Sequence, residues 1–274
     1  LTLNNVFDNT WSGVLTYGKY EKPTIEFWQE CIPKIKSERD DFLFIGEAYW
    51  DLEWELQKLG FDYTYDKKLL DRLKIGHVNE IRGHLMADAD YQAKSVRFIE
   101  NHDEQRAVCS LGVDKSKAAA VVISTINGMR FFNDGQFEGK KIKLPVQLGR
   151  EPNEGINDCI SNFYKSLLRI TNNEIFKFGD WKLIEAKPAW ESNKAYSNFL
   201  IWLLSFNGRK RLVVINFSRE VSQCRVNLKL SNYPPKFKLK DVLNGKTYYR
   251  KTEEVRTEGL YIELGPYKSH IFSY

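Results

Sequence analysis

Two short polar segments, each directly after a strand-like apolar run, carry the residues of this chain that could do acid–base chemistry. The first is Ile45-Gly46-Glu47-Ala48-Tyr49-Trp50 and the second is Phe98-Ile99-Glu100-Asn101-His102-Asp103-Glu104. Because the carboxyl ends of parallel strands face one ligand crevice, we expect Glu47 and Asp103 to lie in the same site. Paired carboxylates suit glycoside hydrolysis, in which one acid protonates the leaving oxygen and another supports the positive charge of the transition state.

Each segment also has a purely structural interpretation. A glutamate after a strand is often a surface acid or an early acid of a helix, and Asn-His-Asp forms turns because Asn and Asp bond the nearby backbone. Tyr49 and Trp50 could stack on sugar faces or fill the core. The combination of two such strand ends favours catalysis more than either segment alone.

Other chemistries have no support in the sequence. The four histidines, His77, His84, His102 and His270, form no HxxxH or HxH pair, and the four cysteines form no CxxC spacing. The sequence contains no glycine-rich phosphate loop and no GxSxG nucleophile motif. We therefore expect no metal and no cofactor at the site.

The first part of the chain alternates strand-like and helix-like segments, which predicts βαβ units and a parallel sheet. The predicted strands are 42–46, 61–65, 96–100 and 129–133. The predicted helices include 24–36, 117–126 and 156–170. The short apolar run at 42–46 is typical of a parallel strand that is buried on both faces.

Near residue 174 the pattern changes to alternating, aromatic-rich segments, which predict antiparallel strands. These segments are 181–186, 199–206, 211–217, 224–228 and 260–264. Asn207-Gly208 predicts a tight hairpin, because both residues tolerate the positive φ that a type I′ turn needs. Residues 1–173 hold 26 acids and 23 bases, whereas residues 174–274 hold 10 acids and 18 bases. We therefore predict two domains, 1–173 and 174–274.

The overall composition is that of a folded chain. With 274 residues, 42% of them hydrophobic, it can bury a sizeable core, which excludes disorder as the main description. A net charge of +5 indicates no nucleic-acid partner, and the longest apolar run, around 198–206, is too short to cross a membrane. The dispersed cysteines predict buried thiols and, with no visible export signal, favour a cytoplasmic location. No pattern indicates an oligomeric state.

Three motifs together resemble the α-amylase family, glycoside hydrolase family 13. They are Phe44–Ala48, Phe98–Asp103 and Gly128–Gly139, and they are similar in order and spacing to motifs of the family's fifth, seventh and eighth barrel strands. The resemblance covers essentially the whole chain. It implies an α/β plus all-β fold: the second half of a (β/α)₈ TIM barrel, strands five to eight, in residues 1–173, followed by an antiparallel C-terminal β-sandwich in residues 174–274.

The resemblance also implies roles for individual residues. By position, Glu47 is expected to be the general acid/base, Asp103 the transition-state stabiliser and His102 a substrate-binding histidine. Further expected members of the substrate pocket are Asn101, Arg106, Tyr49 and Trp50. The implied activity is that of a retaining glycoside hydrolase acting on an α-glucan or maltooligosaccharide. The alternatives are a non-catalytic carbohydrate-binding scaffold, and a glucosyl transferase or isomerase of the same family.

The chain departs from the family pattern at the nucleophile, which is an Asp in an Arg-x-Asp context at the end of the fourth strand. No such motif precedes Glu47, and Asp8 lies in a segment, Asn4–Trp11, that is similar to the one after that strand. A complete barrel needs about 250 residues. The resemblance therefore implies a C-terminal fragment whose nucleophile lies upstream of Leu1, and we expect this chain alone to be inactive.

Overall fold

The computed structural model describes residues 24–49, 51–147, 150–230 and 233–274. The described residues form two compact units, one within residues 24–66 and 94–96 and the other within residues 67–93 and 97–274. The chain leaves the first unit after Asp66, returns to it at Lys94 and leaves it again inside strand β3 (Ser95–Arg97). Asp8 and Trp50 lie outside the described residues. The predicted domain boundary at residue 173 stays a prediction.

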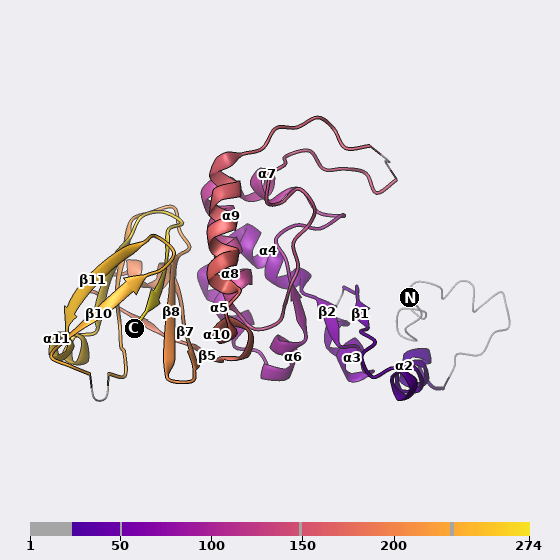
Figure 1. Ribbon diagram of the computed structural model, residues 1–274, viewed down its shortest axis with the longest axis horizontal. Coiled ribbons are helices and arrows are strands. Elements are labelled where there is room, and N and C mark those ends of the chain that lie inside the picture. The colour runs from indigo at the N-terminus through magenta and orange to yellow at the C-terminus, as the bar shows by residue number, and fades with distance from the viewer. Residues whose placement is uncertain (1–23, 50, 148–149, 231–232) are drawn as a thin grey trace. The chain divides into compact units, whose positions relative to one another are not determined.

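In the first unit, short parallel strands alternate with helices (Figure 1). Its elements are α2 (Phe27–Glu38), β1 (Ile45–Gly46), α3 (Glu53–Lys58), β2 (Tyr63–Tyr65) and the start of β3. β1 pairs with β2 with Ile45 opposite Tyr63, and β2 pairs with β3 with Tyr65 opposite Val96. The predicted parallel sheet is confirmed for these strands, which are shorter than the apolar runs of the sequence indicated.

A small apolar core holds α2 and α3 against this sheet. Ile32 of α2, Leu56 of α3 and Phe61 before β2 are at most 4% exposed and cluster together. The prediction that 42–46 is buried on both faces is wrong, because Ile45 is 47% exposed. Successive strand residues point to opposite faces, and among the described residues only the face of Gly46 is covered, by α3 and Phe61.

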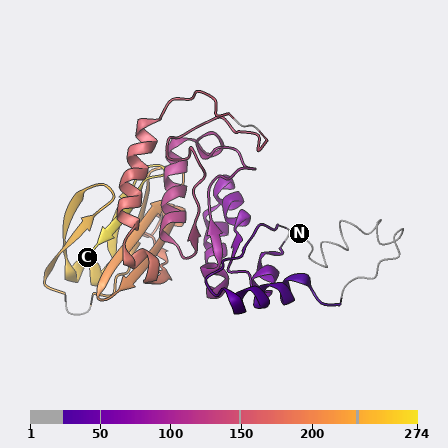
Figure 2. The same ribbon diagram turned by 45° about the vertical axis from the view of Figure 1, so that its right-hand side comes forward.

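Helices form the first part of the second unit. They are α4 (Lys67–Ile75), α5 (Val78–Leu85), α6 (Ala89–Ala93), α7 (Ala107–Leu111), α8 (Val113–Thr125), α9 (Asp158–Thr171) and α10 (Glu174–Phe178), with the short strand β4 (Met129–Arg130) between α8 and α9. α8 and α9 run side by side in both views (Figures 1 and 2). α8 is buried all round from Ala118 to Thr125, whereas α9 buries one stripe through Ile160, Tyr164 and Leu167. Both helices confirm the sequence prediction.

The rest of the second unit consists of two antiparallel sheets that enclose one apolar core. The strands are β5 (Asp180–Leu183), β6 (Ala186–Lys187), β7 (Phe199–Phe206), β8 (Arg209–Asn216), β9 (Ser222–Val226), β10 (Lys236–Asp241), β11 (Lys246–Lys251), β12 (Leu260–Leu264) and β13 (Ser269–Ser273), with the 3₁₀ helix η1 (Ala195–Asn198) and α11 (Thr252–Thr257). The six-stranded sheet has the order β11-β10-β13-β8-β7-β5, and the three-stranded sheet has the order β12-β9-β6. Ile201 and Val214 of the larger sheet pack with Val226 and Ile262 of the smaller one. Two antiparallel sheets around one core are the architecture of a β-sandwich.

The predicted hairpin is confirmed. Asn207 and Gly208 join β7 to β8 with φ of 48° and 74°, so both central residues have the positive φ of a type I′ turn. The sequence pattern did not predict β10, β11 and β13, which complete the larger sheet.

The prediction of buried thiols is right for Cys224 and wrong for two other cysteines. Cys224 faces the sandwich core, whereas Cys109 and Cys159 lie at exposed positions of α7 and α9, and Cys31 is partly exposed. An amphipathic helix buries only one face, so a small thiol can lie on the other. Among the described residues, no helix is both long and apolar enough to cross a membrane.

Candidate active site

Tight packing at the end of β1 places Glu47. A Cβ on Gly46 would lie 2.9 Å from Leu56 Cδ1 and 3.0 Å from Phe61 Cδ1, so a side chain there would collide with α3 and with Phe61, which precedes β2. The half-buried Glu47 follows at once, and the Tyr49 hydroxyl donates a hydrogen bond to Glu47 Oε1 at 2.5 Å. The structure thus brings together two of the predicted site residues, Glu47 and Tyr49.

The end of β2 contributes two groups that the sequence analysis did not select. Burial raises the pKa of Tyr65, and the negative charge of Glu47 raises it further, so this phenol stays neutral beside the carboxylate. Asp66 is 1% exposed, and its N–H donates to Val96 O at 3.1 Å. Burial also raises the pKa of Glu53, and the nearby charge of Asp66 adds to the rise. Tyr65 is the last residue of β2, and Asp66 follows it. Because β2 is parallel to β1, the sequence pattern could have placed both residues at the same edge of the sheet as Glu47.

A buried carboxylate anchors the segment that follows β3. Glu100 is 1% exposed; Arg106 Nη1 donates to its Oε1 at 2.7 Å, and the Ala107 N–H at the start of α7 donates to its Oε2 at 2.6 Å. Asn133 Nδ2, after β4, also donates to Oε1 at 3.3 Å. This one side chain therefore ties the end of β3 to the start of α7 and to the segment after β4.

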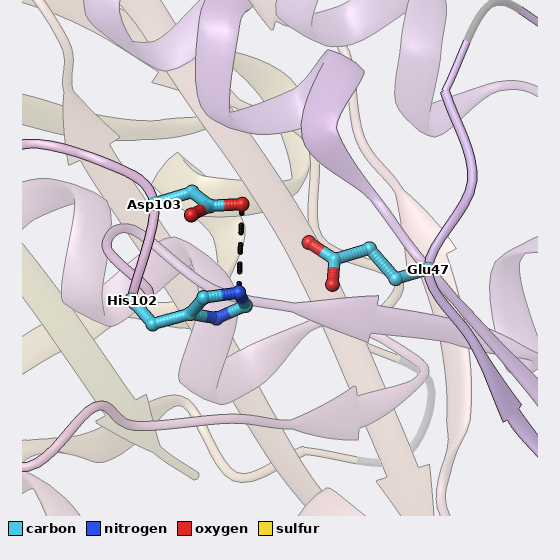
Figure 3. Close-up of side chains that lie close together, drawn as sticks. All are labelled: Glu47, His102 and Asp103. Atoms are coloured by element: carbon cyan, nitrogen blue, oxygen red, sulfur yellow. Dashed lines mark ion pairs between the residues drawn. The ribbon is translucent and has the colours of Figure 1, made fainter. Parts of the chain in front are cut away.

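Asn101 shapes the turn that presents the next two residues. Its Oδ1 accepts hydrogen bonds from the N–H groups of Asp103 at 3.0 Å and Glu104 at 2.9 Å, as in an Asx turn. The turn directs His102 and Asp103 towards solvent, with 46% and 58% of their side chains exposed. His102 Nε2 lies 3.4 Å from Asp103 Oδ2, so the two form an ion pair when the imidazole is protonated (Figure 3).

Glu104 closes the turn with a different kind of contact. It forms ion pairs with Lys74 and, at 3.2 Å, with Lys67, both on α4. Burial alone would raise the pKa of Glu104, but the hydrogen bonds and charges of the two lysines outweigh it and lower the pKa. The carboxylate therefore fixes the end of the turn to α4 and stays ionised.

The predicted site residues thus fall into two groups. Glu47 and Tyr49 are partly exposed after β1, and His102 and Asp103 are exposed after β3. Asn101 and Arg106, at 2% and 6% exposure, are buried and bond to the protein; Arg106 also donates to Asp134 O at 2.5 Å and Ile142 O at 3.1 Å. These contacts hold the segments that carry the exposed residues.

Comparison with known proteins finds likeness in structure only. No protein-family model matches the sequence, and no curated protein matches it significantly. Among solved structures, an α-amylase from Anoxybacillus has a TM-score of 0.70 at 16% identity, covering 90% of this chain and 55% of that one. A maltogenic α-amylase from Thermotoga neapolitana has a TM-score of 0.69 at 19% identity, covering 99% of this chain and 65% of that one. A cyclomaltodextrin glucanotransferase has a TM-score of 0.65 at 20% identity, covering 90% and 53%.

These likenesses establish the class of fold, which is that of α-amylase-type structures. The match extends over nearly the whole chain. The chain in turn spans 53–65% of the length of the three structures. The resemblance of the three sequence motifs to the α-amylase family agrees with this class of fold.

Proposed function

We propose that this chain is part of a retaining glycoside hydrolase that acts on α-glucans, with Glu47 as the general acid/base and Asp103 as the stabiliser of the transition state. The observation that carries the proposal is the parallel pairing of β1, β2 and β3. Glu47 follows β1 directly, and the exposed His102 and Asp103 follow β3. Since all three strands point the same way, their carboxyl ends share one edge of the sheet.

The spacing of strands supports a common site. Neighbouring strands lie about 4.8 Å apart, so β1 and β3 are about 10 Å apart with β2 between them. The proposal requires Glu47 and Asp103, which follow these strands, to contact one sugar unit. The α-amylase-type fold adds weight, because two of the neighbouring structures are α-amylases.

In the proposed mechanism, Glu47 protonates the glycosidic oxygen while a carboxylate nucleophile attacks the anomeric carbon. Glu47 then takes a proton from water or from an acceptor sugar, which displaces the nucleophile. Asp103 supports the charge that develops on the sugar, and His102 donates to a sugar hydroxyl. Tyr49, bonded to Glu47 Oε1, fixes the orientation of the acid. The nucleophile is proposed to be an Asp upstream of Leu1, in keeping with the greater length of the neighbouring structures.

The test is the change Glu47→Ala in the full-length parent protein. We expect cleavage of unactivated maltooligosaccharides to fall ~10²–10⁴-fold, because the leaving oxygen is no longer protonated. With an aryl maltoside that has a good leaving group, the rate of the first step, loss of the leaving group, should fall much less. Added azide should speed up the second step, because it displaces the nucleophile in place of the activated water. If Glu47 had only a structural role, the change would reduce the cleavage rates of both substrates equally.

Glu30→Gln is the matched control, because Glu30 is an exposed acid on α2 in the same unit. It should leave the rates unchanged. Full activity of Glu47→Ala on unactivated substrates would refute the assignment, and a folded parent protein that binds glucans without cleaving them would favour the scaffold alternative.

Transfer of glucosyl units is the second candidate, favoured by the likeness to a glucanotransferase. It uses the same roles for Glu47 and Asp103, with a sugar in place of water in the second step. Product analysis of the parent protein on maltoheptaose separates the two: longer or cyclic glucans indicate transfer, and only shorter glucans indicate hydrolysis.

A further inference from the structure

A polar cavity of about 530 Å³ lies in the second unit. Its walls come from the turn between α4 and α5, the start of α8, the 3₁₀ helix η1 and the loop after β8. Among its lining residues are Lys74, His77, Lys115 and Arg219, and the described lining contains no Asp or Glu. None of the residues proposed above for glycoside cleavage lines this cavity.

The positive charges of Lys115 and Arg219 repel each other at this cavity. Burial lowers the pKa of Lys115, and the nearby charge of Arg219 lowers it further. Lys115 Nζ donates to Lys74 O at 2.6 Å, a neutral acceptor that leaves the ammonium charge unbalanced. A Cβ on Gly76 would lie 3.0 Å from this Nζ, so the glycine leaves room for the ammonium group at the cavity wall.

The acids closest in sequence to these cations pair with basic residues other than Lys115 and Arg219. Asp114 lies 2.9 Å from Lys268 Nζ, Glu104 pairs with Lys74, and Glu80 lies 3.1 Å from His77 Nδ1. Lys74 is thereby balanced, whereas Lys115 and Arg219 have no acidic partner among the ion pairs of the described residues. The cavity therefore presents two cationic side chains that a bound anion would stabilise.

The N-terminus of α5 adds positive potential to the cavity wall. His77 is its N-cap residue and makes no side-chain capping bond, while Val78 and Asn79, the first helical residues, line the cavity. The first N–H groups of a helix have no partner within the helix and carry the positive end of its dipole. Anions bind readily to such ends.

We propose that this cavity is a binding site for a phosphate-type oxyanion, either free phosphate or the phosphate group of a sugar. Lys115, Arg219 and the start of α5 all line the cavity and provide charged or N–H donors for the oxygen atoms of the anion. Bound oxyanion relieves the repulsion between the two cations, so occupancy also stabilises the second unit.

The test is calorimetric titration of the 274-residue chain with sodium phosphate, against sodium chloride at matched ionic strength. We expect saturable binding of phosphate with no equivalent for chloride. Lys115→Met and Arg219→Gln should each weaken it at least ~10-fold, because each removes a charge-assisted hydrogen bond. Lys115→Arg should keep most of the affinity. Lys165→Met, which removes an exposed lysine of α9 outside the cavity, is the matched control.

Two results would overturn the proposal. One is a phosphate response no larger than that of chloride. The other is unchanged phosphate affinity in Lys115→Met and Arg219→Gln, which would mean that Lys115 serves only to bond the end of α4. Melting curves without phosphate show whether each variant is folded. Glucose 6-phosphate, with glucose as its control, distinguishes the two sources: tighter binding than free phosphate indicates a sugar phosphate, and weaker binding indicates free phosphate.

Discussion

The ends of β1 and β3 both present carboxylates, but they hold them in different ways. After β1, the position of Glu47 depends on close packing: Gly46 lies against Leu56 and Phe61, and one tyrosine bonds the carboxylate. After β3, the position of Asp103 depends on the buried ion pair of Glu100 and Arg106 and on Asn101, whose side chain bonds the backbone of the turn.

The difference shows two solutions to one problem, which is to hold a reactive side chain at the end of a short strand. Close packing needs no buried charge, but it tolerates no extra atom. A buried ion pair can hold a longer turn. Removal of one partner, however, lowers the free energy of unfolding strongly, because the other charge remains buried and unpaired. Single substitutions should therefore have unequal effects on the two ends.

The largest effect is expected for Arg106→Met. It leaves Glu100 buried at 1% exposure without its cation, which should lower the free energy of unfolding by about 3–5 kcal/mol. Urea unfolding followed by circular dichroism measures this. Arg39→Met is the control, since Arg39 and Asp41 form a pair with 67% and 70% of their side chains exposed, and should cost less than about 1 kcal/mol. Equal losses in the two variants would contradict the network after β3.

Gly46→Ala tests the packing after β1. The added Cβ would lie 2.9 Å from Leu56 Cδ1, and relieving that overlap should cost about 1–3 kcal/mol of unfolding free energy. Gly83→Ala is the opposite control: Gly83 lies inside α5, and a Cβ there would meet nothing within 4 Å. Alanine should stabilise that helix by about 0.5–1 kcal/mol. Unchanged or increased stability of Gly46→Ala would show that packing at Gly46 does not limit the strand end.

Asn101→Ala tests the turn itself. Loss of the bonds from Asp103 and Glu104 N–H should cost about 1 kcal/mol and increase hydrogen exchange at these two amides. Asn101→Asp keeps an acceptor oxygen and should retain more protection from exchange. If exchange at both amides is the same in Asn101→Ala and the unchanged chain, Asn101 does not shape the turn.

The sequence predicts elements whose cause is local. The Asn207-Gly208 hairpin and the apolar helix α8 follow from turn chemistry and from a continuous apolar run. Strand β10 was missed because its third inward residue is Asp241, which is 0% exposed. Its Oδ2 lies 2.6 Å from Nδ1 of His270, on β13, and also accepts a hydrogen bond from Asn244 Nδ2 at 2.6 Å. No local pattern shows such a partner.

The same distinction between local patterns and contacts made by the fold applies to the candidate site. The strand-end position of Glu47 and the polar motif with His102 and Asp103 are visible in the sequence. The buried state of Arg106 is not, because it depends on a carboxylate and on two backbone carbonyls, those of Asp134 and Ile142, that the fold brings to it. Arg106 thus holds the segment that carries the exposed groups, and its predicted contact with substrate stays a prediction.

The smallest effect expected is a pH-dependent loss of stability when Glu104 is replaced. This effect concerns the turn after β3 and not the end of β1. The pKa of Glu104 is lowered in the folded chain by Lys74 and Lys67, against the opposing effect of burial. A lowered folded pKa gives stability that is present above the unfolded value, about 4.3, and is lost as the pH falls through the folded value. Glu104→Gln should therefore be less stable than the unchanged chain at pH 7, by about 1 kcal/mol or less. Because a protonated Glu104 no longer attracts the lysines, this difference should vanish at a pH below the folded pKa.

Urea midpoints measured from pH 7 to pH 3 check this, with Glu30→Gln as the control that changes an exposed acid of the first unit. A stability difference that stays constant over that range would mean that the ion pairs to α4 do not hold the turn.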